Sequence, residues 1–374
     1  METGNYRVKV IVRDTLYNTV DSGWSPEYEI DTFMNLYNPV AVMPIANFSK
    51  QWAPFNKVTD LLTDLLQEQG FTVLSNEVLE SFMERHRIRY TGGMDRETSQ
   101  AFEKDNIARS VLITALELYD QMNPPKIAIT SRLVSTRNKP EILWMDSVGL
   151  AGHDSPKLLD LGLIKNPREL LRKAIKKLSD SLEVFLEGKK NIIEMNRGWL
   201  EESRFEPKIY HRSSAIIDKD KGYSVAVLPF FNLSDRKYAG DIMAFHFARE
   251  MRNVKNFNII EPGVVRDALL KLRVVMFDGI SLFHAQTIFS ILNADFIITG
   301  TVLDYNDYAG PIGRPDVDFS TQLIDRRNRE IIWTSKSYNM GDDDVYFFDF
   351  GKINTANLMA SEMVSAIIKL MIAQ

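Results

Sequence analysis

The feature that most constrains the fold of this chain is an internal repeat. Residues 40–49, Val-Ala-Val-Met-Pro-Ile-Ala-Asn-Phe-Ser, align with residues 225–234, Val-Ala-Val-Leu-Pro-Phe-Phe-Asn-Leu-Ser, at an offset of 185. Three further blocks follow in the same order, at offsets of 186, 185 and 189: 71–74 with 257–260, 113–115 with 298–300, and 141–144 with 330–333. Two unrelated domains that share apolar strands would not explain the matched Pro, Asn, Ser and Trp. We therefore predict a tandem duplication.

The repeat divides the 374 residues into four segments. They are an N-terminal arm (1–37), a first copy (38–188), a linker (189–222) and a second copy (223–374). Each copy falls within the roughly 100–200 residues of a typical domain. In the arm, residues 7–12 are typical of an edge strand and residues 23–26 of a turn. The composition, with 45% hydrophobic and 25% charged residues, is that of an ordinary globular protein.

Each copy has the pattern of a mixed α/β domain with the element order βαβααβββα. A short β-branched run opens each copy, and the last two strands of each are expected to form a hairpin around a polar turn. In the second copy, apolar residues at 317, 319 and 323 alternate with polar ones, which predicts one solvated sheet face. The first helix of that copy, near 239–251, has a less regular apolar spacing than its counterpart. The expected fold class is α/β, with a mixed sheet packed by helices in each copy.

No motif in the chain indicates an active site. The sequence contains no metal-binding spacing among its five histidines, no phosphate-binding glycine loop and no nucleophile elbow. It also lacks cysteine, which excludes disulfides and thiolate metal sites. The acidic run 341–344 is interpreted as a solvated turn rather than a cation site, and the basic row within 168–177 as the wet face of a helix. We expect no catalytic residue, no metal and no cofactor.

Four polar residues are the best candidates for a ligand site. Asn47 and Ser49 follow the first strand of the first copy, and Asn232 and Ser234 occupy the same place in the second. Polar side chains after an opening strand often face a ligand in α/β folds. Helix capping or turn formation explains the same residues without a ligand. Both interpretations stay open at this point.

Charge and hydropathy limit the classes of partner. The net charge of −5 and the pI of about 5.7 do not favour a nucleic-acid binder, which usually carries a basic domain. No apolar run reaches the roughly 18 residues of a membrane-spanning helix. The N-terminus has neither the basic nor the apolar region of a signal peptide. We expect either a cytoplasmic protein or one whose leader has been removed.

Three stretches of the second copy resemble a known family. Residues 225–234 look like the opening strand of CsgG-like and TolB N-terminal-like domains, residues 293–302 are similar to their A-D-x-x-x-x-G strand, and residues 318–333 resemble their terminal hairpin. The resemblance implies envelope proteins of Gram-negative bacteria, often lipoproteins, that act by binding and in some cases form rings. A channel role needs long inserted hairpins, whereas the segment 304–316 is short and rich in Gly and Pro. The cysteine of a lipoprotein is also absent.

The sequence thus favours a non-enzymatic scaffold or adaptor of a bacterial envelope assembly. We expect it in the periplasm, free or tethered to the outer membrane, with protein partners and no nucleic acid. Homo-oligomers would form through free sheet edges or the N-terminal arm. The alternative is a small-molecule-sensing or regulatory module, which could be cytoplasmic, with its ligand near Asn47 and Ser49 or Asn232 and Ser234. A hydrolase or transferase role rests only on scattered Asp and His residues.

Overall fold

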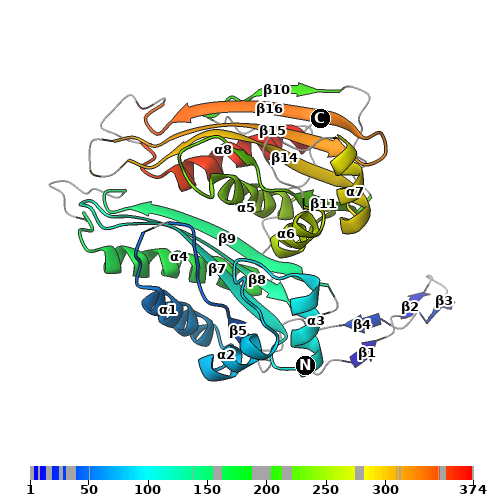
Figure 1. Cartoon of the computed structure of the whole chain (residues 1–374). Coiled ribbons are helices and arrows are strands. Elements are labelled where there is room, and N and C mark those ends of the chain that lie inside the picture. Colours follow the sequence, from blue (N-terminus) through cyan, green and yellow to red (C-terminus); the bar gives the residue numbers. More distant parts are fainter. Residues whose placement is uncertain are drawn as a thin grey trace.

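The computed structural model describes most of the chain. The described residues are 4–6, 9–13, 19–24, 28–30, 39–49, 51–137, 139–154, 162–187, 204–212, 221–273, 282–308, 310, 313–343, 345 and 351–372. We call the described residues between 39 and 187 the first half and those between 204 and 372 the second half. Each half holds one mixed sheet packed by helices (Figure 1). The predicted α/β class, with a mixed sheet in each half, is confirmed.

The first half contains a five-stranded sheet with the order β5-β7-β8-β9, in which β6 also pairs with β7. β5 and β6 run parallel to β7, and the remaining pairs are antiparallel. The elements are β5 (Val40–Val42), β6 (Ala46–Asn47), α1 (Phe55–Glu68), α2 (Asn76–Arg85), α3 (Arg96–Asp105), β7 (Ser110–Asp120), β8 (Lys126–Ser135), β9 (Glu141–Ala151) and α4 (Pro167–Leu186). The strand expected at 71–74 is reduced to a single bridge between Val73 and Val40.

The second half contains a seven-stranded sheet with the order β10-β16-β15-β14-β11-β13, in which β12 pairs with β14. Its core order β11-β14-β15-β16 corresponds to β5-β7-β8-β9, and β10 is an additional edge strand. The elements are β10 (Lys208–His211), β11 (Tyr223–Val227), β12 (Phe231–Asn232), α5 (Ala239–Arg252), β13 (Phe257–Ile259), α6 (Pro262–Lys271), α7 (Leu282–Leu292), β14 (Phe296–Asn306), β15 (Asp316–Asp325), β16 (Glu330–Met340) and α8 (Ala356–Ile372).

Strand pairing corrects one block of the repeat alignment. Val42 pairs with Leu112, and its counterpart Val227 pairs with Ile298. Leu112 therefore corresponds to Ile298 at an offset of 186, one residue more than the sequence blocks had indicated. The error arose because both strands are runs of similar apolar residues, in which a slip of one position changes the face but hardly the composition. We call two positions matched when they occupy the same place in these pairing registers.

Local sequence explains where several helices begin. Ser75 caps α2, Asp95 caps α3 and Asn166 caps α4, and each side-chain oxygen accepts a backbone N–H from the first turn. Pro167 occupies the first turn of α4, where its missing N–H costs nothing. These caps satisfy donors that a helix start would otherwise leave unpaired.

In each half, one pair of helices covers one face of the sheet and a second pair covers part of the other face. In the first half, α1 and α4 pack on one sheet face through residues such as Leu62 and Leu178, while α2 and α3 cover part of the other through Phe82 and Phe102. In the second half, α5 and α8 take the place of α1 and α4, and α6 and α7 that of α2 and α3. In both halves the second pair leaves the hairpin strands uncovered on its own face.

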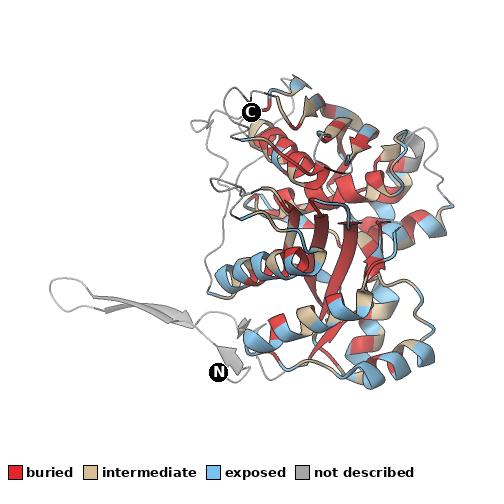
Figure 2. Cartoon of the chain, turned by 90° about the vertical axis from the view of Figure 1, so that its left-hand side faces the viewer, coloured by how far each residue is buried: buried red, intermediate tan, exposed pale blue. Residues whose placement is uncertain are grey.

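The two halves are stacked, and α5 and α8 form the layer between their sheets (Figure 1). One apolar cluster joins residues of both halves, including Phe48 and Met145 from the first and Phe245 and Met363 from the second. The burial view shows this shared interior as a continuous buried region (Figure 2). Almost every residue of α5 is buried, because the helix faces a sheet on each side. Two-sided burial explains the irregular apolar spacing seen in its sequence.

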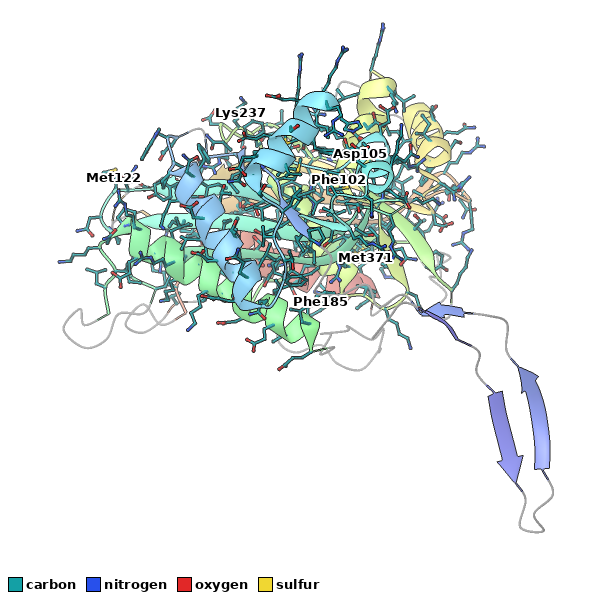
Figure 3. The ribbon with its side chains drawn as sticks, turned by 90° about the horizontal axis from the view of Figure 1, so that it is seen from below. Phe102, Asp105, Met122, Phe185, Lys237 and Met371 are labelled. Atoms are coloured by element: carbon teal, nitrogen blue, oxygen red, sulfur yellow. The ribbon has the colours of Figure 1, made fainter. Side chains whose placement is uncertain are left out.

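The N-terminal arm forms two small antiparallel ribbons. β1 (Gly4–Tyr6) pairs with β4 (Tyr28–Ile30), and β2 (Lys9–Arg13) pairs with β3 (Thr19–Trp24). The strand expected at 7–12 overlaps β2, but it pairs within the arm rather than at the edge of a domain sheet. Of the turn expected at 23–26, residues 23 and 24 belong to β3, and the other two lie outside the described residues. The arm projects away from the body (Figures 1 and 3).

Candidate functional site

The most strongly constrained contact between the halves is a buried ion pair. Arg132 lies on β8, and Glu261 is the N-cap of α6. Nε and Nη2 of Arg132 donate to Oε1 of Glu261 at 3.0 and 2.8 Å, and both side chains are 0% exposed. The guanidinium also lies over the ring of Phe245. Burial raises the pKa of Glu261, and the neighbouring Arg132 opposes that rise. This pair ties the first sheet to the second half.

A second buried carboxyl lies deeper between the halves. Glu117 on β7 accepts from Thr130 Oγ1 and from Asn357 Nδ2, each at 2.6 Å. Asn357 is on α8, so the carboxyl again links the two halves. Burial raises the pKa of Glu117 to about 7, although both hydrogen bonds favour its charged form. The guanidinium of Arg236 donates to the backbone carbonyl of Glu117.

A cavity of about 440 Å³ opens beside this cluster. Its charged lining residues come from both halves: Asp120 from the first, and Arg236 and Asp307 from the second. Asp307 accepts the backbone N–H of Ala356 at 2.7 Å, and burial raises the pKa of its carboxyl. Met122, labelled in Figure 3, lies on the cavity wall. The cavity is therefore an interface feature rather than a cleft within one half.

The chemistry of this region is that of a structural junction. Glu117 and Glu261 accept hydrogen bonds from side chains of the opposite half, whereas Asp120 and Asp307 accept backbone N–H groups of their own half. Within the part of the chain that the structure describes, no group of three or more His, Asp or Glu could hold a metal ion. His246 is buried on α5, and burial holds the pKa of its imidazole well below the usual range. A buried histidine whose ring nitrogens have no hydrogen-bond partner fits a core position.

The four residues predicted as ligand contacts form two identical turns. In the first, Asn47 Oδ1 accepts from the backbone N–H and the hydroxyl of Ser49 at 3.0 and 2.8 Å, and Asn47 Nδ2 donates to the carbonyl of Gln51. In the second, Asn232 Oδ1 accepts from the same two groups of Ser234 at 3.1 and 2.7 Å. Asn232 Nδ2 donates to the carbonyl of Arg236 at 2.7 Å. Turn formation accounts for these polar atoms.

The structure nevertheless brings the two turns to one place. Gln51 ends the first turn and Arg236 ends the second, and both line the 440 Å³ cavity. Phe48, inside the first turn, stacks on Tyr238 with ring centroids 4.6 Å apart. The four predicted residues themselves are not among the cavity lining. Ligand binding by them stays a prediction.

A larger difference between the halves concerns one face of each sheet. On the first sheet, α5 and α8 cover Phe48, Ile142 and Met145, which are all buried. The matched residues of the second sheet are Leu233, Ile331 and Thr334. Leu233 is 57% exposed and Ile331 41% exposed. The described residues place no helix over this part of the second sheet.

We call this surface the open face. It consists of alternate residues on β14, β15 and β16 and of neighbouring exposed residues: Thr301, Asp304, Asp318, Ser320, Gln322, Thr334, Lys336, Tyr338, Tyr210, Leu233 and Ile331. The polar alternation in β15 had indicated a solvated face. The matched surface of β8 is buried along its whole length. Nothing in the sequence indicates that Leu233 and Ile331 are exposed, because an apolar residue on a strand normally indicates a core position.

One pair of matched positions shows why α8 can pack closely on the first sheet, whereas no described helix packs in this way on the second. Gly149 on β9 lies against the start of α8, and a Cβ atom there would come within 2.6 Å of Thr355 Oγ1 and 2.7 Å of Asn357 Oδ1. The matched position on β16 is Tyr338, whose side chain is 51% exposed. The small residue permits close approach of the helix on the first sheet, whereas a large ring stands at that point on the second.

Comparison with known proteins gives distant structural similarity only. No family model matches the chain, and no curated protein matches it. Among solved structures, the PelC dodecamer from Paraburkholderia phytofirmans is similar at 16% identity and a TM-score of 0.29, covering 44% of this chain and 96% of PelC. Lipoprotein GNA1162 from Neisseria meningitidis gives 17% identity and a TM-score of 0.29, covering 39% of this chain and 99% of its own.

A third similar structure is the C-terminal domain of LpoB from Salmonella enterica, at 18% identity and a TM-score of 0.24. The similarity covers 32% of this chain and 83% of the LpoB chain. Each of the three similarities extends over less than half of this protein. At these identities and scores they carry no argument about function. No described helix is long and apolar enough to cross a membrane.

Proposed function

We propose that this chain is a tandem duplication that serves as a non-enzymatic scaffold or adaptor in a Gram-negative envelope assembly. The proposed compartment is the periplasm, with or without a tether to the outer membrane. The sequence resemblance of residues 225–234, 293–302 and 318–333 to CsgG-like and TolB-like domains supports the family and the compartment. The corresponding strand orders of the two sheets support the duplication.

The open face is the observation that carries the proposed binding role. The matched face of the first sheet is covered by α5 and α8, whereas the open face exposes Leu233, Ile331 and Tyr338. Exposed apolar side chains set among polar ones are typical of surfaces that bind another protein. Asp304 and Asp318 add two negative charges beside them and Lys336 one positive charge, so the net charge there is negative. The partner we propose presents an apolar surface with basic residues at its margin.

The test is capture of a partner from envelope fractions of the native organism, with the full chain as bait. The double variant Leu233→Asp/Tyr338→Asp places charge on the open face at positions that the fold leaves exposed. We expect it to lose the captured partner and to remain folded, with an unfolding free energy lowered by no more than about 2 kcal/mol, because Tyr338→Asp places a second carboxylate opposite Asp318 on β15. The matched control is Val78→Asp, which alters an exposed apolar residue on α2. Equal capture by both variants would refute binding at the open face.

Cell fractionation tests the compartment separately. The native protein should appear with periplasmic or outer-membrane markers. Recovery with cytoplasmic markers alone would contradict the envelope role, and it would leave the binding test unaffected.

A second candidate function is ligand sensing at the junction of the halves. Gln51 and Arg236 bring the two turns to a cavity that also contains Asp120 and Asp307. A small cationic or zwitterionic metabolite would suit two carboxylates and one guanidinium. Thermal shift with such compounds should then depend on Arg236, and Arg236→Gln is the test variant. Stabilisation that persists in this variant would place the ligand elsewhere.

A further inference from the structure

The outer edge of the second sheet is closed by a strand from the segment that precedes its opening strand β11. β10 pairs antiparallel with β16, with Ile209 opposite Ser335 and His211 opposite Trp333. The pairing continues as the backbone N–H of Arg212 donates to the carbonyl of Ile332 at 3.0 Å. In this half, therefore, the residues ahead of the opening strand complete the sheet beside its last hairpin strand.

The matched edge of the first sheet, along β9, has no such strand among the described residues. A single bridge joins Glu141 to Ile260 at its beginning. Further along, Arg252 Nε donates to the carbonyl of Ile142 at 3.0 Å, and Arg249 Nη1 donates to that of Ser147 at 3.3 Å. Two side chains thus reach edge carbonyls, and the backbone N–H of Ser147 donates to Asp146 Oδ1 at 2.7 Å. The backbone of residues 144–147 lies at the position that β10 covers on β16, so an added strand would exchange the bonds at Ser147 for main-chain ones. An uncovered strand edge is a template for pairing with another chain.

A groove of about 1120 Å³ runs beside this edge. Its walls are the first part of β9, the end of α4 with Val184 and Phe185 (Figure 3), and the segment from 252 to 260. Five basic residues line it against three acidic ones: Arg96, Lys139, Arg249, Arg252 and Lys255 against Glu141, Asp146 and Glu250. The chain as a whole carries a net charge of −5, so the groove is basic relative to the rest of the protein. An acidic extended segment would suit it.

The segment ahead of the first half resembles the one that contains β10. Residues 24–30, Trp-Ser-Pro-Glu-Tyr-Glu-Ile, share with residues 205–211, Phe-Glu-Pro-Lys-Ile-Tyr-His, an aromatic residue, a proline two positions later and then a strand. β4 occupies the place of β10 in this match. The sequence of β4 and the two residues that flank it is acidic, with Glu29 in the strand and Glu27 and Asp31 on either side. In the structure β4 pairs with β1 on one side, and the arm projects away from the body (Figures 1 and 3).

We propose that β4 of a second copy of this chain adds to β9 as an antiparallel strand and closes the first sheet as β10 closes the second. The matched register places Tyr28 opposite Asp146 and Ile30 opposite Trp144. Main-chain hydrogen bonds supply the affinity of such strand addition. The acidic side chains beside β4 meet the basic groove, which favours association and fixes the register. A second copy is the donor because the arm projects from its own body. This inference does not depend on an envelope partner.

The chain lacks cysteine, so introduced cysteines report strand pairing without background. A tagged Tyr28→Cys chain is mixed with an untagged Asp146→Cys chain and oxidised. Directly opposed residues on antiparallel strands are close enough for a disulfide after small adjustment. We expect a disulfide-linked heterodimer that the tag retrieves. A second pair, Glu27→Cys with Ser147→Cys, tests the same register and leaves the ion pair between Asp146 and Arg249 intact.

Two controls define the outcome. Tyr28→Cys mixed with Asp180→Cys, an exposed residue of α4, should give only background crosslinking. Ile209→Cys/Ser335→Cys on one chain should close an intrachain disulfide, because β10 and β16 are already paired. Heterodimer yields no higher than the Asp180→Cys background for both test pairs would overturn the proposal. So would a Tyr28→Cys/Asp146→Cys double variant that forms intrachain disulfides alone.

Removal of residues 1–37 supplies an independent measurement by light scattering. The full chain should have a molar mass above that of one chain, and the truncated chain should have that of one. Glu27→Lys/Glu29→Lys should raise the dissociation constant by at least about tenfold, because two attractions in the groove become repulsions. A full chain whose molar mass remains that of a monomer at the highest soluble concentration would contradict strand exchange between copies.

Discussion

β8 and β15 are matched strands in matched sheets, yet they lie in different surroundings. β8 is buried along its whole length, because α1 and α4 cover one side and α5 and α8 the other. β15 alternates between buried and partly exposed residues, because only one of its sides is covered over most of its length. Arg132 on β8 makes a buried ion pair, while the matched Gln322 on β15 is partly exposed. The same place in one topology can thus be core or surface, depending on what is stacked against it.

The largest effect should come from breaking the buried ion pair. Arg132→Met leaves Glu261 buried without its cationic partner, and should lower the unfolding free energy by about 4 kcal/mol in chemical denaturation. Gln322→Met at the matched position should change it by less than about 0.5 kcal/mol. The double variant Arg132→Met/Glu261→Gln should recover part of the loss, since no charge is then left buried. Equal effects at Arg132 and Gln322 would break the comparison of the two faces.

The aromatic contact at the junction should give the next largest effect. Phe48 stacks on Tyr238 and Phe245, with ring centroids 4.6 and 5.8 Å apart. Phe48→Ala should cost about 3 kcal/mol of unfolding free energy, from lost burial and the cavity that remains. Leu233→Ala, at the matched exposed position, should cost less than about 0.5 kcal/mol. A large loss of unfolding free energy in Leu233→Ala would mean that another part of the protein covers the open face in solution.

A smaller effect is expected where α8 approaches β9. In Gly149→Ala the new methyl would meet Thr355 and Asn357 of α8, and forced adjustment should cost about 2 kcal/mol. Tyr338→Ala on β16 removes an exposed ring and should cost less than about 1 kcal/mol. Denaturant titration of both variants measures the difference. A neutral Gly149→Ala would show that the halves have room to separate at this point.

The smallest effect concerns pH. Burial raises the pKa of folded Glu117 to about 7, above its ordinary value of 4.5. The folded state therefore keeps a proton that the unfolded chain loses, so this group's stabilising contribution is complete below pH about 4.5 and is lost as the pH rises through about 7. Glu117→Gln should remove this pH dependence. The difference in unfolding free energy between variant and parent should shift in favour of the variant by on the order of 1–2 kcal/mol from pH 5 to pH 8. An unchanged pH profile would show that Glu117 is charged in the folded protein.

Much of the fold followed from local patterns, because strands, caps and hairpin turns depend on neighbouring residues. The opening strands, the hairpins and the Asn47 and Asn232 turns all lie where short-range chemistry predicts them. The strand expected at 71–74 was an overestimate: apolar residues there suit a strand, but only Val73 finds a pairing partner. The class and most of the element order therefore needed no tertiary information, whereas the loss of this strand and the added edge strand β10 could not be read from local patterns.

The candidate site could not be predicted in this way, because it depends on how the halves stack. The apolar spacing of α5 was irregular, and its cause, burial on two sides, is a property of the assembly rather than of the helix. Arg132 is one of two charged residues in β8, and nothing nearby in sequence points to Glu261, 129 positions away. Exposed residues such as Ile331 follow the same pattern as buried ones. Only the coordinates separate them.

Tyr338 in place of Gly149 has a consequence for solubility. Within the molecule, the helical layer of α5 and α8 packs on the first sheet. A helical surface, formed by α1 and α4, and a sheet surface, the open face, occur again at the two outer ends of the molecule. If those ends fitted each other, molecules would join head to tail without limit and grow into fibres. The tyrosine ring fills the space that a helix would need, and the far end carries charged residues such as Arg172 and Lys176. Both features oppose the addition of a third layer, so we expect no growth of that kind.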